Sequence, residues 1–155
     1  MELGNFLKGK QVLEIFAGNG YLSGCLAERG IAVKATTIFS GHDSHRGGLY
    51  HPVTERKASL AVIEFGEAAD VLLMCWPTTT WDALLAVQLW GPSKDIVFIG
   101  EITNYAKGHL GGCATDEFFD AITVLRKFDS YQGNMLEAAI VCRLSSRGTH
   151  PDPIL

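Results

Sequence analysis

A glutamate followed closely by two glycines is the first feature of this sequence that could do chemistry. Glu14 stands in an otherwise apolar stretch, and Gly18 and Gly20 follow it in an E-x-x-x-G-x-G arrangement. A glycine turn between a strand and a helix lets the backbone approach a ligand and directs helix N–H groups at it. A carboxylate inside a strand is costly to bury unless it accepts hydrogen bonds or faces a cationic ligand. The segment therefore predicts either a nucleotide-type ligand site or a turn braced by the Glu14 carboxylate.

Apolar periodicity indicates the elements that must position this turn. The residues before it form a short apolar run typical of a buried strand, and the residues after it show helical spacing that ends at Gly30. The expected strands cover residues 11–16, 31–39, 70–75, 95–100, 128–131 and 137–144, with a short one near Val53. The expected helices cover residues 21–29, 60–65, 81–90 and 116–125.

The last two helices have apolar residues at helical spacing, which predicts the side that each turns toward the core. Thr115 precedes the final helix, where its hydroxyl can cap the first turn. The residues expected to face the core are Trp81, Leu84, Leu85 and Leu89 in the helix 81–90, and Phe118, Ile122 and Leu125 in the helix 116–125.

Strands that alternate with helices and are apolar throughout predict a mainly parallel sheet covered on both faces. We expect a doubly wound α/β sheet of six or seven strands. Because no helix separates the last two strands, they are expected to form a hairpin that places one antiparallel strand at or near the sheet edge. Ligands of such sheets bind at the carboxyl ends of the strands, here the first, second, fourth and fifth.

The glycine turn resembles the first motif of the class I S-adenosylmethionine-dependent methyltransferases, in a small and divergent form. In that family the acidic residue and the turn lie against the methionine part of the cofactor. The segment Trp76-Pro77-Thr78-Thr79 follows a strand where many members have a proline-containing motif. The resemblance follows the element order from residue 11 to about 144, and it implies a Rossmann-like methyltransferase fold that binds S-adenosylmethionine. A flavodoxin-like or dinucleotide-binding domain fits less well, because Ser23 stands where a third glycine is needed.

The resemblance also implies which residues line the site. The residues expected to bind the cofactor are Glu14, Phe16, Gly18, Asn19, Gly20, Thr37, Lys57, Trp76 and Pro77. The residues expected on the substrate side are Thr78, Glu101 and His109. No residue is compelled to be the general base, and the candidates by loop position are His42, His45, Glu101 and His109. The methyl acceptor is not indicated by the sequence.

Two positions depart from the family pattern. Family members usually end the second strand in an acidic residue that holds both ribose hydroxyls, and this chain has Thr37 there. Beside the adenine amino group it has Lys57, which can only donate hydrogen bonds. These departures favour a second hypothesis, a binding or regulatory module that keeps the fold and has a degenerate cofactor site. Methyltransferase and non-catalytic module both remain open.

Composition excludes several other classes. The chain of 155 residues has 13 basic and 17 acidic residues, so it lacks the excess of positive charge that nucleic-acid binding usually needs. No basic leader or membrane-length apolar run is present, so a cytoplasmic protein that does not contact a membrane is expected. We expect one domain over residues 1–144 and a loose tail over 145–155. Such a small domain makes a homodimer or a partner protein plausible.

Histidine and cysteine patterns do not indicate a metal site or a reactive thiol. The segment His42-Asp43-Ser44-His45 matches no closed metal site, and histidines in a polar loop are usually solvated. The four cysteines form no C-x-x-C pair, so free thiols are expected. Cys75 and Cys142 lie inside apolar runs, where a thiol behaves as a small buried hydrophobe.

Overall fold

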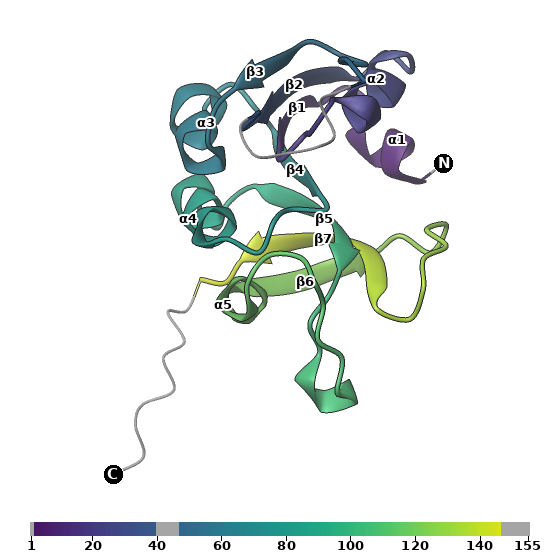
Figure 1. Cartoon of the computed structure of the whole chain (residues 1–155), viewed down its shortest axis with the longest axis vertical. Helices are drawn as coiled ribbons and strands as arrows, with labels where there is room; N and C mark the ends of the chain where they lie inside the picture. Colours follow the sequence, from purple (N-terminus) through teal and green to yellow (C-terminus); the bar gives the residue numbers. More distant parts are fainter. Residues whose placement is uncertain (1, 40–46, 147–155) are drawn as a thin grey trace.

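A seven-stranded sheet forms the centre of the computed structural model, which describes residues 2–39 and 47–146 (Figure 1). Its strand order is β3-β2-β1-β4-β5-β7-β6. The strands are β1 (Gln11–Ile15), β2 (Ala32–Thr37), β3 (Val53–Glu55), β4 (Val71–Cys75), β5 (Asp95–Glu101), β6 (Ile122–Lys127) and β7 (Glu137–Leu144). The helices are α1 (Glu2–Leu7), α2 (Tyr21–Ala27), α3 (Ala58–Phe65), α4 (Trp81–Trp90) and α5 (Asp116–Ala121), with a 3-10 turn η2 (Tyr105–Lys107).

Strand directions confirm the expected topology. The strands from β1 to β5 pair in parallel, whereas β7 runs antiparallel to both β5 and β6. The antiparallel strand β7 therefore lies next to the edge strand β6. This position was predicted because no helix was expected between the last two strands. In the described residues no helix has the length and apolar character needed to span a bilayer.

The sheet separates two apolar layers, because side chains of successive strand residues point to opposite faces. In β1, Leu13 and Ile15 pack with the α3, α4 and α5 layer, whereas Val12 packs with Leu7 of α1 and Leu26 of α2. Figure 1 shows α3 and α4 on one side of the sheet and α1 and α2 on the other. The doubly wound arrangement is thus confirmed.

The residues that α4 buries are Ala83, Leu84, Ala86, Val87 and Trp90. Ala83, Ala86 and Val87 are fully buried, whereas Trp81 is 64% exposed. The expectation that Trp81, Leu85 and Leu89 face the core is wrong, and of the predicted set only Leu84 is buried. Residues 83, 86, 87 and 90 have the same helical spacing as the predicted stripe, so periodicity alone could not choose between two apolar sides.

The end of the chain differs from the prediction because a helix stops early. Ile122 and Leu125 belong to β6 and not to a helix, and residues 128–131 do not form the expected strand. The run Ile-Thr-Val-Leu is rich in β-branched residues, which favour a strand, and it finds a partner in β7. A register shift between Val124 and Arg126 interrupts the pairing at Leu125, whose side chain is exposed.

Thr115 caps α5 as expected, since its hydroxyl accepts a hydrogen bond from Phe118 N at 3.4 Å. Replacing it by alanine (T115A) should lower the free energy of unfolding by about 1 kcal/mol, measured by urea denaturation. Thr80 is the matched control, because it occupies the same position before α4 but makes no capping hydrogen bond. Equal losses in T115A and T80A would contradict this interpretation.

Candidate functional site

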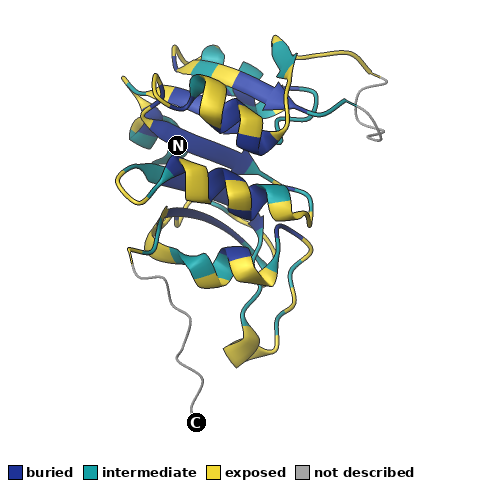
Figure 2. Ribbon diagram, turned by 90° about the vertical axis from the view of Figure 1, so that its left-hand side faces the viewer, coloured by how far each residue is buried: buried dark blue, intermediate teal, exposed yellow. Residues whose placement is uncertain are grey.

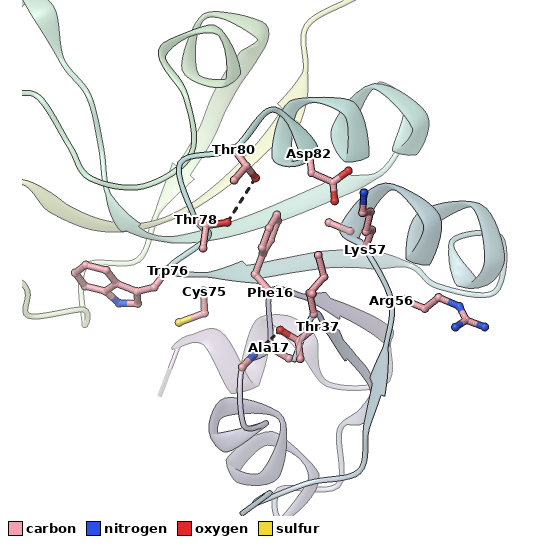
Figure 3. Close-up of a pocket in the computed structure, with 13 residues that line it drawn as sticks. Phe16, Ala17, Thr37, Arg56, Lys57, Cys75, Trp76, Thr78, Thr80 and Asp82 are labelled. Atoms are coloured by element: carbon pink, nitrogen blue, oxygen red, sulfur yellow. Dashed lines mark hydrogen bonds between the residues drawn. The ribbon is translucent and has the colours of Figure 1, made fainter. Parts of the chain in front are cut away.

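A cavity of about 640 Å³ lies over the carboxyl ends of β1, β2, β3 and β4 (Figure 3). The chain runs from β1 outward to β2 and β3 and then returns to β4 on the other side of β1, and this change of direction opens a crevice. The expected cleft thus has the third strand in place of the fifth. The described residues that line it are Phe16, Ala17, Gly18, Thr37, Ile38, Arg56, Lys57, Ala58, Cys75, Trp76, Thr78, Thr80 and Asp82.

The turn after β1 is tied to the neighbouring strand β2. Gly18 N donates to the hydroxyl of Thr37 at 3.3 Å, and Ala17 N donates to Thr36 O at 3.0 Å. Thr37 therefore has a structural role at the position where the methyltransferase resemblance expects a carboxylate. Its hydroxyl proton is left to donate to one further group.

The glycine at position 20 is required by packing inside the chain. Its φ is +76°, and a Cβ there would lie 2.9 Å from Val53 Cγ2 and 3.1 Å from His51 Cβ. The preceding Asn19 accepts a hydrogen bond from Tyr50 N at 2.9 Å. Asn19 and Gly20 thus meet the segment that leads into β3, and neither is among the described residues that line the cavity.

Glu14 lies below the turn and is 1% exposed. Its carboxyl group accepts a hydrogen bond from the hydroxyl of Ser23 in the first turn of α2. Burial raises the pKa of Glu14 to about 7, although the Ser23 hydrogen bond acts in the opposite direction. Ser23, which replaces the third glycine of a dinucleotide fingerprint, is therefore the partner of this buried carboxyl group.

Arg56 and Asp82, two of the charged residues that line the cavity, have partners within the chain. Arg56 Nε donates to Glu64 at 2.6 Å, and this pairing raises the pKa of Arg56. Asp82 accepts hydrogen bonds from Ser59 Oγ at 2.5 Å and from Ser59 N at 3.3 Å. Asp82 was missed at the sequence level. The signal was an acidic residue in the first turn of the helix that follows a cleft strand.

Two aromatic residues at the cavity adopt the left-handed backbone region. Phe16 has φ +60° and Trp76 has φ +54°, each directly after the last residue of its strand. For residues with a Cβ this conformation costs about 1–2 kcal/mol. Figure 3 shows the Phe16 ring among the other lining residues, whereas Trp76 points away from it. Trp76 is 47% exposed. Of these two strained residues, Phe16 begins the turn after β1 and Trp76 directly follows Cys75.

Cys75 lines the cavity but is not an activated nucleophile. Burial raises the pKa of its thiol to about 12, so the thiol stays protonated near neutral pH. Burial likewise raises the pKa of Cys142 to about 12. All four cysteines are free thiols, as expected.

The structure assembles only part of the predicted site. Phe16, Gly18, Thr37, Lys57, Trp76 and Thr78 meet at the cavity. Glu14, Asn19, Gly20, Pro77, Glu101 and His109 are not among its described lining residues.

Each of the remaining predicted residues has a different environment. Pro77 is buried, and its carbonyl accepts from Ala114 N. Glu101 accepts from Gly112 N at 2.6 Å, and His109 pairs with Asn104 in the loop that extends beyond β5 in Figure 1.

His42, Asp43 and His45 lie outside the described residues. Within residues 2–39 and 47–146 no three His, Cys, Asp or Glu side chains are grouped as metal ligands would be. Any role of this histidine-containing loop in catalysis or metal binding therefore stays a sequence-level hypothesis.

Gly20→Ala should destabilise the fold more than Gly9→Ala. Both glycines have φ near +77°, so a methyl group strains the backbone by about 1–2 kcal/mol at either position. A Cβ at Gly9 meets nothing within 4 Å, whereas one at Gly20 overlaps Val53 and His51. The overlap should add about 1–3 kcal/mol to the loss, measured by urea denaturation. If both variants lose the same free energy, the close approach at Gly20 is refuted.

Stability should depend on pH through Glu14. Its pKa is about 7 in the folded chain and 4.5 ordinarily. Below 4.5 both states are protonated, and between the two values only the unfolded state has released its proton. The free energy of unfolding therefore falls as pH rises, by about 3 kcal/mol once the pH exceeds 7.

Glu14→Gln should abolish this slope and make the protein more stable than wild type above pH 7. Glutamine keeps an acceptor for the Ser23 hydroxyl and is not charged at any pH. Unfolding curves at a series of pH values give the comparison. Glu28→Gln, which changes an exposed residue at the end of α2, should leave the slope in place.

Comparisons with known proteins show similarity at the level of structure. No family model matches the sequence, and no curated protein matches it. The chain is similar to a mutant of MtNAS solved in complex with S-adenosylmethionine, with a TM-score of 0.62 and 16% identity. That similarity covers 92% of this chain and 58% of MtNAS, so the chain spans a little more than half the length of that protein.

Two further solved structures are similar over more of their own length. A protein from Pyrococcus horikoshii gives a TM-score of 0.60 at 11% identity, covering 93% of this chain and 86% of the other. A putative type 11 methyltransferase from Sulfolobus solfataricus gives a TM-score of 0.57 at 13% identity. That similarity covers 99% of this chain and 95% of the other. The chain therefore has the Rossmann-like fold of the class I S-adenosylmethionine-dependent methyltransferases.

Proposed function

We propose that this chain is an S-adenosylmethionine-dependent methyltransferase-like protein whose cofactor binds in the cavity above β1–β4. The observation that supports the proposal most is the place of the cavity, at the strand ends on both sides of the turn. Its volume lies within the roughly 300–1,000 Å³ of small-molecule sites. The solved complex of MtNAS with S-adenosylmethionine adds support from the same fold.

The residues present suit an adenosine-type ligand in part. Phe16, Ile38 and Ala58 give the cavity apolar surface against which a planar base can pack. The hydroxyl of Thr37 is held by Gly18 N and can donate to one ribose oxygen. A single hydroxyl binds a ribose less firmly than a carboxylate that accepts from both of its hydroxyls.

The remaining roles follow from the same proposal. When bound, the sulfonium cofactor supplies an activated methyl group, and the protein has to align the acceptor and exclude water. Thr78 lies at the cavity, so it is the best placed of the predicted substrate-side residues. Glu101 and His109 stay predictions without a cavity contact. The proposal includes the cytoplasmic location, for which free thiols are typical.

A non-catalytic binding or regulatory module is the second candidate, and one observation favours it. The only carboxylate among the described lining residues is Asp82, and Ser59 already donates two hydrogen bonds to it. Among those residues no carboxylate without a partner remains for the ribose. The fold alone does not decide between the two functions, because it carries many unrelated activities.

Calorimetry with S-adenosylmethionine and S-adenosylhomocysteine tests the proposal. We expect both to bind wild type, and Thr37→Asp to bind at least about tenfold more tightly. The aspartate restores a carboxylate at the strand end and can still accept from Gly18 N. Thr123→Asp on β6, at the opposite edge of the sheet, is the matched control and should not change the affinity.

The two candidates predict different results. If neither wild type nor T37D binds either compound, the cofactor site is refuted and the module is favoured. Binding that is equally strengthened in T123D would show a general effect of added charge rather than ribose recognition.

A further inference from the structure

Glu14 is a buried carboxyl group that makes no direct contribution to the described cavity lining. It lies in β1, in the middle of the sheet, where Figure 2 shows the strands as buried. Among the described residues it is the only charged residue that is buried. A buried carboxyl group without a countercharge is costly, so its presence here needs a reason beyond packing.

The surroundings of Glu14 give its carboxyl group one donor and no countercharge. Side chains alternate along a strand, so Glu14 points to the same side of the sheet as Val12, toward α2. There the hydroxyl of Ser23 donates to the carboxyl group. Its neighbours across the sheet are Ala35 of β2 and Leu73 of β4, and neither is charged. No described lysine, arginine or histidine pairs with it.

Among the described residues, Cys75 is the titratable side chain that faces Glu14. It stands two residues after Leu73, the strand partner of Glu14, so both side chains are on the same side of the sheet. Burial is the main cause of the raised pKa of the Cys75 thiol, and the Glu14 charge adds to it. Cys75 lines the cavity, and so does the turn that begins two residues after Glu14. The carboxyl group therefore lies just behind the cavity lining.

A carboxyl group in this position distinguishes ligands by charge without touching them. In a low-dielectric interior the attraction between opposite charges reaches beyond contact distance, and salt screens it little. Burial disfavours the charged form of the carboxyl group, and a cation in the cavity favours it. A ligand of the same shape that lacks the cation gives no such gain.

The proposed cofactor would bring a cation to this side of the cavity. Thr37 at the end of β2 is assigned to the ribose, and Thr78 after β4 to the methyl acceptor. The strand ends between these two residues are those of β1 and β4, so the sulfonium belongs there. Cys75 and the turn after β1 line that part of the cavity.

We propose that Glu14 is a specificity-determining residue that favours S-adenosylmethionine over S-adenosylhomocysteine, the thioether product that lacks the sulfonium charge. Glu14 gives up its proton to solvent when the sulfonium is bound, and keeps it when the thioether is bound. The inference rests on the proposed function, because it requires this cofactor in the cavity. Loss of the sulfonium charge in methyl transfer would then weaken binding of the product and favour its release.

The expected pH dependence follows from the pKa of Glu14, which burial raises to about 7. Below this pH the carboxyl group of the free protein is protonated, and binding of a cation has to remove the proton. Above it the carboxyl group is already charged. The affinity for S-adenosylmethionine relative to S-adenosylhomocysteine should therefore rise with pH up to about 7. Both compounds have the same amino acid and adenosine parts, so titration of those parts cancels in the ratio.

Calorimetry with both compounds, from about pH 5.5 to about pH 8, measures this ratio of affinities. In wild type the ratio should rise at least about threefold over this range. In Glu14→Gln it should stay at the low value that wild type has at acid pH. Glutamine keeps an acceptor for the Ser23 hydroxyl, so the turn is retained. Glu28→Gln, which changes an exposed residue at the end of α2, should behave as wild type.

Ser23→Ala separates an effect of charge from an effect of structure. The Ser23 hydrogen bond lowers the pKa of Glu14, so its loss should move the rise of the ratio to higher pH without removing it. Proton release is a second readout. At about pH 6, the heat of S-adenosylmethionine binding to wild type should depend on the ionisation enthalpy of the buffer more than the heat of S-adenosylhomocysteine binding does.

Three results would overturn the proposal, and they can be told apart. A wild-type ratio that does not change with pH shows that Glu14 does not respond to the cation, although the cofactor site stands. A ratio that rises equally in E14Q comes from another group. If neither compound binds at any pH, the cofactor site itself is refuted, and the role of Glu14 with it.

Discussion

The carboxyl edge of the sheet depends on how the chain closes over the buried carboxyl group of Glu14. Between β1 and α2 the backbone must reverse within five residues, and it does so with Phe16, Gly18 and Gly20 in the left-handed region. Ser23 binds the carboxyl group from α2, and Thr37 holds the turn from β2. The turn made by this closure contributes Phe16, Ala17 and Gly18 to the lining of the cavity.

The same closure explains why the site has few free polar groups. Thr37, Ser23 and Ser59 each hold a neighbouring element, and Asp82 is bound by Ser59. These hydrogen bonds fix the geometry of the crevice, but they also occupy groups that a ligand would otherwise use. Besides apolar contact with the lining, a ligand of this cavity would find the hydroxyl proton of Thr37 and the ammonium group of Lys57. That pattern is common to binding sites and does not by itself imply catalysis.

Sequence reasoning succeeded where one physical signal dominated. The apolar strands and the glycine turn predicted the topology, because buried parallel strands leave few alternatives. It failed on α4, where residues 81, 85 and 89 and residues 83, 86, 87 and 90 are equally periodic, and the choice depends on packing against the sheet. It also extended a helix into β6, since the pairing with β7 is a contact between distant residues. For Gly20 the residue type was noticed, but the neighbour that requires it, Val53, is visible only in three dimensions.

The backbone at Phe16 and Trp76 bears on what the cavity is for. Glycine would adopt φ near +60° without strain, so an aromatic residue costs about 1–2 kcal/mol at each position. Phe16 recovers part of this by packing against the core, but Trp76 is 47% exposed and recovers less from burial. Strain that packing does not offset is typical of ligand sites, where the side chain matters more than the stability. The proposed methyltransferase and the proposed binding module both need such a surface, so the strain supports a ligand in this crevice whichever of the two functions the chain performs.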